Sequence, residues 1–271
     1  MLLVDTHCHL TSPPLAGQVD VVLDAAAAVG VGLVIVPGID GASSREAVAL
    51  AARFPGRVFA AVGDHPQVDA AQATDLRLLR ELAVQPGVVA MGEIGLDGEL
   101  ATPGLDVQEA RLRAQLRLAR ELGLPVLLHC RKSWARFATI LREELPGGPG
   151  GVLHAWAGSA ELYRELAPLG LLCGVAGVVT WPVARRLRAT LAHIPPSQLL
   201  LETDAPYIGT ASRHRGTVRP QELPEILHAL AALTGLAPAE LARATTANAR
   251  RLFGLDRGIL PAGPPGPAGP Q

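Results

Sequence analysis

Eight short apolar segments recur along the 271 residues of this sequence, and segments with a helical pattern separate them. The apolar segments are Leu2–Leu10, Leu33–Gly38, Val58–His65, Val88–Leu96, Val126–Cys130, Val152–Ala155, Leu171–Val179 and Leu199–Thr203. Most are continuous hydrophobic runs, which is typical of parallel strands that helices cover on both faces. The regular alternation therefore predicts the α/β class with a parallel sheet.

The segment Val107–Leu122 shows the helical pattern most clearly. The residues Leu112, Leu116, Ala119 and Leu122 fall on one stripe, and Gly123 marks the end of the helix before the next strand. Eight strand–helix units predict a closed (β/α)8 TIM-type barrel, whose active site lies at the C-terminal ends of the strands. We expect one domain over residues 1–257 and a flexible Pro/Gly-rich tail over residues 258–271. An open doubly wound sheet is the alternative fold.

The composition limits the classes of protein that this chain can be. Apolar residues make up 49% and charged residues 18%, which excludes wholesale disorder, and no apolar stretch approaches the roughly 20 residues of a membrane span. The formal net charge of −1 provides no global positive field for extended nucleic-acid binding. There is no signal-peptide pattern and there are three cysteines. We therefore expect a cytoplasmic protein without disulfides, membrane contact or an obligate protein partner.

Polar side chains that suit a metal ion stand near the ends of five apolar segments. His7 and His9 are two residues apart, so both imidazoles point the same way on an extended strand. A single histidine can be a satisfied core residue, but only a closed ring of strands would bring this whole set together. Four imidazoles and two carboxylates suit zinc, manganese or magnesium and exceed the needs of one tetrahedral ion. We predict two divalent cations, with the ligands His7, His9, Glu93, His129, His154 and Asp204.

Glu93 is the candidate for a ligand that bridges the two cations. Its two oxygens can each bind one ion at the separation of about 3.5–4 Å that is usual for paired metals. Lys132, the single lysine, lies beyond a strand end and is the weaker candidate. Glu202 shares a strand face with Asp204, so we expect Glu202 to orient a ligand, and we assign the same role to Asp97.

Basic residues near the strand ends could contact an anionic substrate. Arg131 and Lys132 follow His129, while Ser212–Arg215 and Arg219 lie after the last strand. These residues could form a positive rim that binds phosphate, or they could belong to ordinary charged loops. The aromatic fraction of 3% argues against an extended stacking groove and favours a short substrate end that enters a pocket.

Six motifs, in this order, resemble the TatD family of metal-dependent deoxyribonucleases within the amidohydrolase-like barrels. The motifs are Asp5–His9, Val62–Pro66, Gly92–Asp97, His129–Arg131, His154–Gly158 and Glu202–Tyr207, and the likeness runs from Met1 to about Leu255. The resemblance implies one cation held by His7, His9, Glu93 and Asp204 and another held by Glu93, His129 and His154. It also implies that His65 faces the substrate phosphate. Mg²⁺ or Mn²⁺ commonly supports activity in this family, with Zn²⁺ also possible here.

Three positions depart from the family pattern. Gly98 stands where an aromatic residue commonly follows the Gly-Leu-Asp motif, so this loop offers no aromatic face there. The segment Gly216–Glu222 lacks the Asn-Glu-Pro that is often found after the last strand. The third departure is His154-Ala155-Trp156, which replaces the more familiar His-Cys-Phe. Trp156 could offer a stacking face or fill the core.

From the residues and the resemblance we predict an enzyme that hydrolyses DNA phosphodiesters, as a 3′–5′ exonuclease on single strands. Asp204 and Glu93 are the catalytic residues, with Asp204 accepting a proton from metal-activated water, while His65 and Arg131 bind the substrate. The nearest alternative is an esterase or amidase such as a D-aminoacyl-tRNA deacylase, because barrel metallohydrolases reuse one metal centre for many bonds. A non-catalytic scaffold that binds metal or nucleic acid is a third hypothesis.

Overall fold

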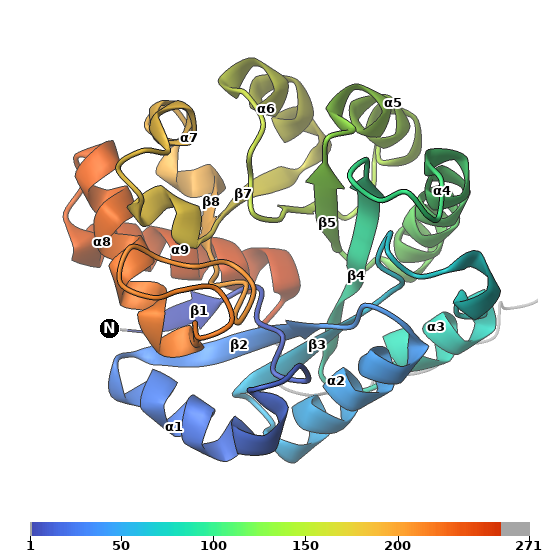
Figure 1. Ribbon diagram of the computed structural model, residues 1–271, viewed down its shortest axis with the longest axis horizontal. Coiled ribbons are helices and arrows are strands. Elements are labelled where there is room, and N and C mark those ends of the chain that lie inside the picture. The colour runs from blue at the N-terminus through green and yellow to red at the C-terminus, as the bar shows by residue number, and fades with distance from the viewer. Residues whose placement is uncertain (1, 256–271) are drawn as a thin grey trace, which may run out of the picture.

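Eight parallel strands form one sheet in the order β1 to β8 in the computed structural model, which describes residues 2–255 (Figure 1). The strands are β1 (Leu3–Asp5), β2 (Val31–Pro37), β3 (Val58–Val62), β4 (Val88–Asp97), β5 (Val126–Arg131), β6 (Gly151–Leu153), β7 (Leu171–Val175) and β8 (Leu199–Leu201). The predicted (β/α)8 barrel is confirmed. The predicted tail, residues 258–271, lies outside the described residues.

The ring closes between β8 and the chain that follows β1. The backbone N–H of Thr6 donates to the carbonyl oxygen of Leu201 at 3.0 Å, and the N–H of His9 donates to that of Ala205 at 2.8 Å. Between these two bonds, Cys8 and Ala205 form a parallel bridge. The first and last strands are therefore neighbours, which excludes the open doubly wound sheet.

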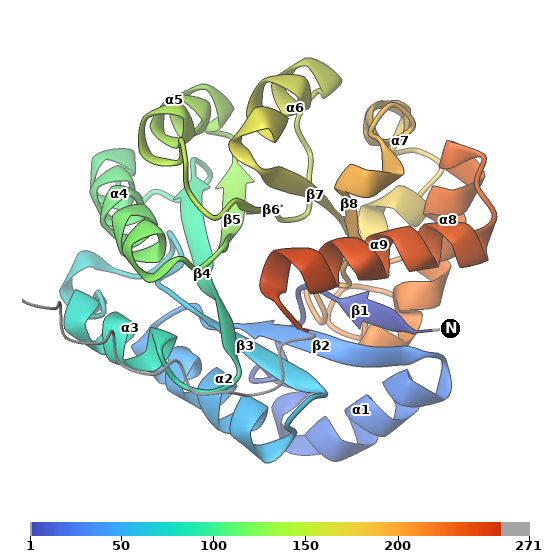
Figure 2. The same ribbon diagram turned by 180° about the vertical axis from the view of Figure 1, so that it is seen from behind.

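Helices surround the sheet (Figures 1 and 2). They are α1 (Val19–Ala28), α2 (Gly41–Arg53), α3 (Leu76–Ala83), α4 (Leu105–Leu122), α5 (Trp134–Glu144), α6 (Ala160–Leu166), α7 (Arg185–Leu191), α8 (Leu223–Thr234) and α9 (Pro238–Phe253). Short 3₁₀ helices include η1 (Ala16–Gln18) and η4 (Gly177–Thr180). The predicted stripe on α4 is buried except at its last residue, Leu122, which is partly exposed, and the helix ends at Gly123, whose φ of 67° suits glycine.

The last helix, α9, lies across the N-terminal end of the barrel (Figure 2). Its residues Ala249 and Phe253 pack with Val4, Ile35 and Phe59 in the cluster that fills this end. A larger apolar cluster fills the space between the sheet and the surrounding helices. Because α9 covers the N-terminal end, loops at the opposite end are free to form a site, as in other barrels of this type. We call that opposite end the mouth.

Several strands end earlier than the sequence predicts. β1 ends at Asp5 rather than Leu10, β3 at Val62 rather than His65, and β7 at Val175 rather than Val179. Most residues beyond these ends stay buried although they have left the sheet. An apolar run in the sequence indicates that its residues are buried, whereas a strand also needs hydrogen-bonding partners for its backbone. The end of the apolar run and the end of the strand can therefore differ.

The three cysteines, Cys8, Cys130 and Cys173, are free. Cys8 and Cys173 are fully buried members of the larger apolar cluster. Among residues 2–255, no helix combines the length and the hydropathy that are needed to cross a bilayer.

Candidate metal centre

Six side chains that the sequence analysis named as metal ligands meet at the mouth. They come from within β4 and β5 and from the residues that follow β1, β6 and β8, and they are His7, His9, Glu93, His129, His154 and Asp204. Five of them expose at most 7% of their surface, and His129 is partly exposed. The closed ring brings together residues that lie far apart in the sequence.

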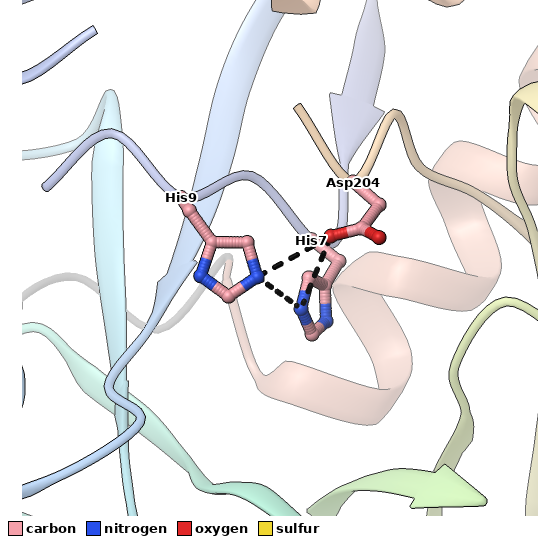
Figure 3. A group of neighbouring side chains, drawn as sticks. All are labelled: His7, His9 and Asp204. Atoms are coloured by element: carbon pink, nitrogen blue, oxygen red, sulfur yellow. Dashed lines mark hydrogen bonds and ion pairs between the residues drawn. The ribbon is translucent and has the colours of Figure 1, made fainter. Parts of the chain in front are cut away.

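His7, His9 and Asp204 form the first cluster (Figure 3). The Nε2 atoms of His7 and His9 are 3.1 Å apart, and Nε2 of His9 lies 3.3 Å from Oδ1 of Asp204. Both histidines lie beyond β1, yet their side chains still converge because the bridge of Cys8 with Ala205 keeps the intervening chain extended. Two imidazole nitrogens and a carboxylate oxygen that face one another are a suitable ligand set for a divalent cation.

Glu93 lies between this cluster and a second one, and its two oxygens face different partners. Oε2 is 3.3 Å from Nε2 of His7 and 3.7 Å from Nε2 of His9. Oε1 is 3.0 Å from Nδ1 of His129 and 3.9 Å from Nε2 of His154. This division of one carboxylate between two groups of imidazoles is the arrangement that a bridging ligand requires.

Two further carboxylates contact the outer sides of ligand candidates. Nε2 of His129 lies 3.3 Å from Oδ2 of Asp97, and Nδ1 of His154 lies 2.8 Å from Oε1 of Glu202. A ring nitrogen this close to a carboxylate oxygen carries a proton, so Glu202 holds Nδ1 of His154 and turns Nε2 toward Glu93 and Asp204, where a bound cation would take the place of the proton on Nε2. Glu202 and Asp97, the two residues predicted to orient ligands, thus each contact one candidate ligand.

His65 borders the same site, but its hydrogen bonds differ from those of a ligand. The backbone N–H of Gln67 donates to Nδ1 of His65 at 3.1 Å, so the neutral ring carries its proton on Nε2. That Nε2 lies 3.7 Å from Oε1 of Glu93. Burial lowers the pKa of His65 to about 4, which keeps the ring neutral at pH 7. His65 can therefore donate a hydrogen bond to an oxygen at the mouth.

Three residues near the mouth have backbone conformations that residues other than glycine rarely adopt. The φ angle is 50° at Asp204, 42° at Ala155 and 55° at Lys132. Specific hydrogen bonds hold two of them, because the N–H of Asp204 donates to His7 O at 2.8 Å and that of Ala155 donates to Glu202 Oε1 at 2.6 Å. Strained residues of this kind cluster at functional sites.

The charges of the site depend on strong local interactions. Burial opposes ionisation of Glu93, but the facing imidazoles of His65 and His7 outweigh it, and the pKa of Glu93 lies well below its usual range. Burial likewise opposes the charged form of His154, yet Glu202 and Asp204 hold its pKa well above its usual range. The site thus carries ionised carboxylates at neutral pH, as a cation site needs.

Asp5 is a buried carboxylate that the sequence analysis did not single out. Its Oδ1 accepts hydrogen bonds from the N–H of Thr203 at 2.9 Å and of His7 at 3.3 Å, and its Oδ2 accepts one from Oγ1 of Thr203 at 2.6 Å. These bonds fasten the end of β1 to the end of β8 and so fix His7 relative to Asp204. Burial raises the pKa of Asp5 to about 7. A carboxylate inside the apolar segment Leu2–Leu10 was the signal that could have found it.

The basic residues of the mouth are partly neutralised by acidic neighbours. Arg131 borders the cavity and exposes 59% of its side chain, but it faces Asp97 at 4.0 Å and Glu99 at 3.7 Å. Nζ of Lys132 lies 3.1 Å from Glu99, and Nε of Arg213 lies 3.2 Å from Glu222. Of these residues, Arg131 alone borders the cavity at the centre of the mouth.

Trp156 fills the core and does not offer a stacking face at the mouth. It is 1% exposed, and its ring centroid lies 5.0 Å from that of Trp134. The cavity at the mouth has a volume of about 480 Å³, which is within the range of small-ligand sites, and His9, His65, Glu93, His129, Arg131 and Asp204 are among its lining residues.

The residues at the mouth fit divalent cations by their own chemistry. Two unprotonated ring nitrogens at 3.1 Å, as between His7 and His9, repel each other unless a proton or a cation lies between them. Nδ1 of His7 is buried and has no hydrogen-bond partner among the described residues. Nitrogen and carboxylate donors at these separations suit manganese or zinc, and the carboxylates also suit magnesium.

Comparison with known proteins gives a consistent result. The family model described as TatD related DNase matches residues 4–254. A relative from Musicola paradisiaca, named 3′-5′ ssDNA/RNA exonuclease TatD, is 38% identical, and the match covers 93% of this chain and 97% of that protein. A relative from Bacillus subtilis, named as the metal-dependent hydrolase YabD, is 34% identical, and the match covers 94% of this chain and 100% of that protein.

Among solved structures, the TatD homologue YjjV of Escherichia coli superimposes with a TM-score of 0.87 at 34% identity, over 93% of this chain and 98% of that one. An organophosphorus hydrolase at 16% identity and a TM-score of 0.61 shares the fold alone. The family match and the similarity to these relatives extend over nearly the whole described chain. The protein thus belongs to the TatD family of metal-dependent hydrolases.

Proposed function

We propose that the protein hydrolyses phosphodiester bonds of single-stranded DNA from the 3′ end with the help of two divalent cations. The observation that carries the proposal is the position of Glu93, whose two oxygens face two separate groups of imidazoles. The name of the Musicola relative, an exonuclease on single-stranded DNA and RNA, supports a nucleic acid as the substrate. A cytoplasmic location is also our proposal, in keeping with three free cysteines.

We assign the ligands on the basis of the contacts at the mouth. One cation would be held by His7, His9, Glu93 and Asp204, and the other by Glu93, His129 and His154. Mg²⁺ or Mn²⁺ is the proposed metal, and Zn²⁺ is the alternative that the four imidazoles favour. His65 stays outside both sets, because its proton lies on the nitrogen that faces the site.

The residues of the chain supply the remaining parts of the mechanism. When bound, divalent cations lower the pKa of water and neutralise charge that develops on phosphoryl oxygens. Asp204 is ionised, since His154 and His9 outweigh its burial and hold its pKa below the usual range, so it can accept the proton of the attacking water. Nε2–H of His65 donates to a phosphoryl oxygen, and the guanidinium of Arg131 binds the next phosphate.

The test uses purified protein and a single-stranded oligonucleotide with a label at its 5′ end, assayed with Mg²⁺, Mn²⁺ and Zn²⁺ in turn. A ladder of products that shorten from the 3′ end is expected. The D204N substitution should reduce turnover by at least about 100-fold while it leaves binding of the oligonucleotide nearly unchanged. As a matched control, D24N removes an exposed carboxylate on α1 and should leave turnover unaltered.

Two results would contradict the proposal. If D204N kept full activity at saturating metal, Asp204 would not be the proton acceptor. If the oligonucleotide stayed intact with all three metals, while a D-aminoacyl-tRNA was deacylated under the same conditions, the substrate assignment would be wrong and the esterase hypothesis would replace it.

A further inference from the structure

The lining of the cavity at the mouth has parts of different chemistry. The part formed by residues after β3 and at the end of β5 is polar and carries His65, Gln67 and Arg131. Another part of the lining carries Ala157, Val178, Tyr207 and Ile208, which come from the segments after β6, β7 and β8. We call these four residues the apolar wall. Five of the six candidate metal ligands also line the cavity, and they are His9, Glu93, His129, His154 and Asp204.

Tyr207 is the most exposed large side chain of the apolar wall. It is 44% exposed, and apart from imidazoles no aromatic ring of another described residue borders the cavity. Its hydroxyl donates a hydrogen bond to Oγ of Ser12 at 2.9 Å, and its N–H donates to the carbonyl oxygen of Asp204 at 2.7 Å. The ring is therefore held at its polar end and through its backbone, which leaves much of the ring accessible.

We infer that the apolar wall binds the terminal nucleobase of the substrate, with Tyr207 as the stacking residue. The inference rests on the proposed function and defines one part of the same site. A nucleotide has an anionic phosphate and a flat base with apolar faces. Arg131 and His65 match the phosphate, and the apolar wall matches the base.

The composition of the wall also determines its selectivity. Side chains of alanine, valine and isoleucine have no donor or acceptor, and the hydroxyl of Tyr207 is bonded to Ser12. The wall can therefore contact the face of any base but cannot read the hydrogen-bonding edge. We expect the four bases to be accepted within about threefold of one another, because stacking tolerates sequence. The volume of about 480 Å³ suits one terminal unit and not a duplex.

Tyr207 also contacts a candidate ligand, and the experiment separates the two roles. The ring meets that of His9 edge to face, with centroids 4.9 Å apart and planes at 74°. If Tyr207 only positioned His9, its removal would impair every substrate equally. If Tyr207 stacks on the base, its removal should matter only for a substrate that has a base.

The experiment compares wild type, Y207A and Y207F on two oligonucleotides. One has an ordinary 3′-terminal nucleotide, and the other has the same phosphodiester but an abasic residue at the terminus. Wild type should cleave the abasic substrate with kcat/KM about tenfold lower. Y207A should lower kcat/KM about tenfold for the ordinary substrate and leave it unchanged for the abasic one. Y207F keeps the aromatic face and should still prefer the ordinary substrate to the abasic one, whereas Y207A should not. The control V183A changes an exposed residue outside the cavity and should behave as wild type.

Product binding gives an answer that does not depend on turnover. In the presence of Mn²⁺, wild type should bind deoxynucleoside 5′-monophosphates about tenfold more tightly than 2-deoxyribose 5-phosphate, and Y207A should bind both equally. Equal affinities in wild type, or equal losses of kcat/KM on both oligonucleotides in Y207A, would overturn the inference. Failure of wild type to cleave any oligonucleotide would contradict the proposed function alone. Should Y207A not fold, Y207L keeps the bulk of the side chain without the aromatic face.

Discussion

Replacement of Glu202 should reveal how strongly a buried carboxylate outside the ligand set controls metal binding. Glu202 is fully buried, and its Oε1 lies 2.8 Å from Nδ1 of His154 and accepts a hydrogen bond from the N–H of Ala155 at 2.6 Å. In E202Q an amide oxygen can still accept from both nitrogens, so the geometry is kept and the charge is lost. In E202A both donors lose their partner.

The expected magnitudes follow from these contacts. Loss of a residue that orients a metal-bound histidine weakens metal affinity by about 10–100-fold. We expect about tenfold for E202Q, or about 1.4 kcal/mol, and about 100-fold for E202A, because only E202A also frees the ring of His154. Each buried donor without a partner costs about 1–3 kcal/mol, so E202A should lower the free energy of unfolding by about 2 kcal/mol or more.

The assay is calorimetric titration of the metal-free protein with Mn²⁺, together with urea unfolding in the presence of a chelator. E144Q is the matched control, since Glu144 is also a buried glutamate but lies on α5, where it pairs with arginines of α4. Wild-type Mn²⁺ affinity in both Glu202 variants would refute the reasoning. A loss of affinity in E144Q as large as that in E202Q would show that the effect does not come from His154.

Three further predictions test other parts of the structure. Mn²⁺ at about 100 times its dissociation constant should stabilise the protein by about 2.7 kcal/mol and raise its Tm in a thermal melt; H9A should lose most of this shift, and an equal shift in H9A would exclude His9 as a ligand. G95A should abolish folding or lower the free energy of unfolding by more than about 3 kcal/mol, because its Cβ would lie 1.8 Å from the carbonyl oxygen of His129, whereas G17A meets no atom within 4 Å and should change stability by less than about 0.5 kcal/mol in the same denaturation experiment. The pairing of Glu144 with Arg117 and Arg113 lowers the pKa of Glu144, so this pairing stabilises the fold above the unfolded-state pKa of about 4.5 and is lost as the pH falls through the folded-state pKa. E144Q should therefore be less stable than wild type at neutral pH and approach it in acid below the folded-state pKa, and a difference that does not change with pH would refute this sign.

The sequence by itself determined the architecture, because parallel strands and their helices leave a periodic pattern of apolar residues. The eight segments, the helix over Val107–Leu122 and its end at Gly123 all follow from local preferences that neighbouring residues express together. The strand ends did not follow in the same way. β1 was predicted to reach Leu10, but it ends at Asp5, since burial and backbone pairing stop at different residues.

The candidate ligands could also be found from the sequence, because a carboxylate or imidazole at the end of an apolar segment needs a cation or a hydrogen-bonding partner once it is buried. The geometry of these ligands relative to one another could not be found from the sequence. The direction of each oxygen of Glu93 and the protonated nitrogen of His65 depend on how the folded chain places their neighbours.

The sequence also did not show that Asp5 joins β1 to β8 or that Trp156 is buried rather than exposed, because both depend on the folded neighbours of these residues. The lining of the cavity is mixed because the closed ring brings residues after β3 and at the end of β5 to the same rim as those after β6, β7 and β8. Distances across the barrel are fixed only when the ring closes, so the tertiary structure alone decided which part of the lining is polar and which offers Tyr207.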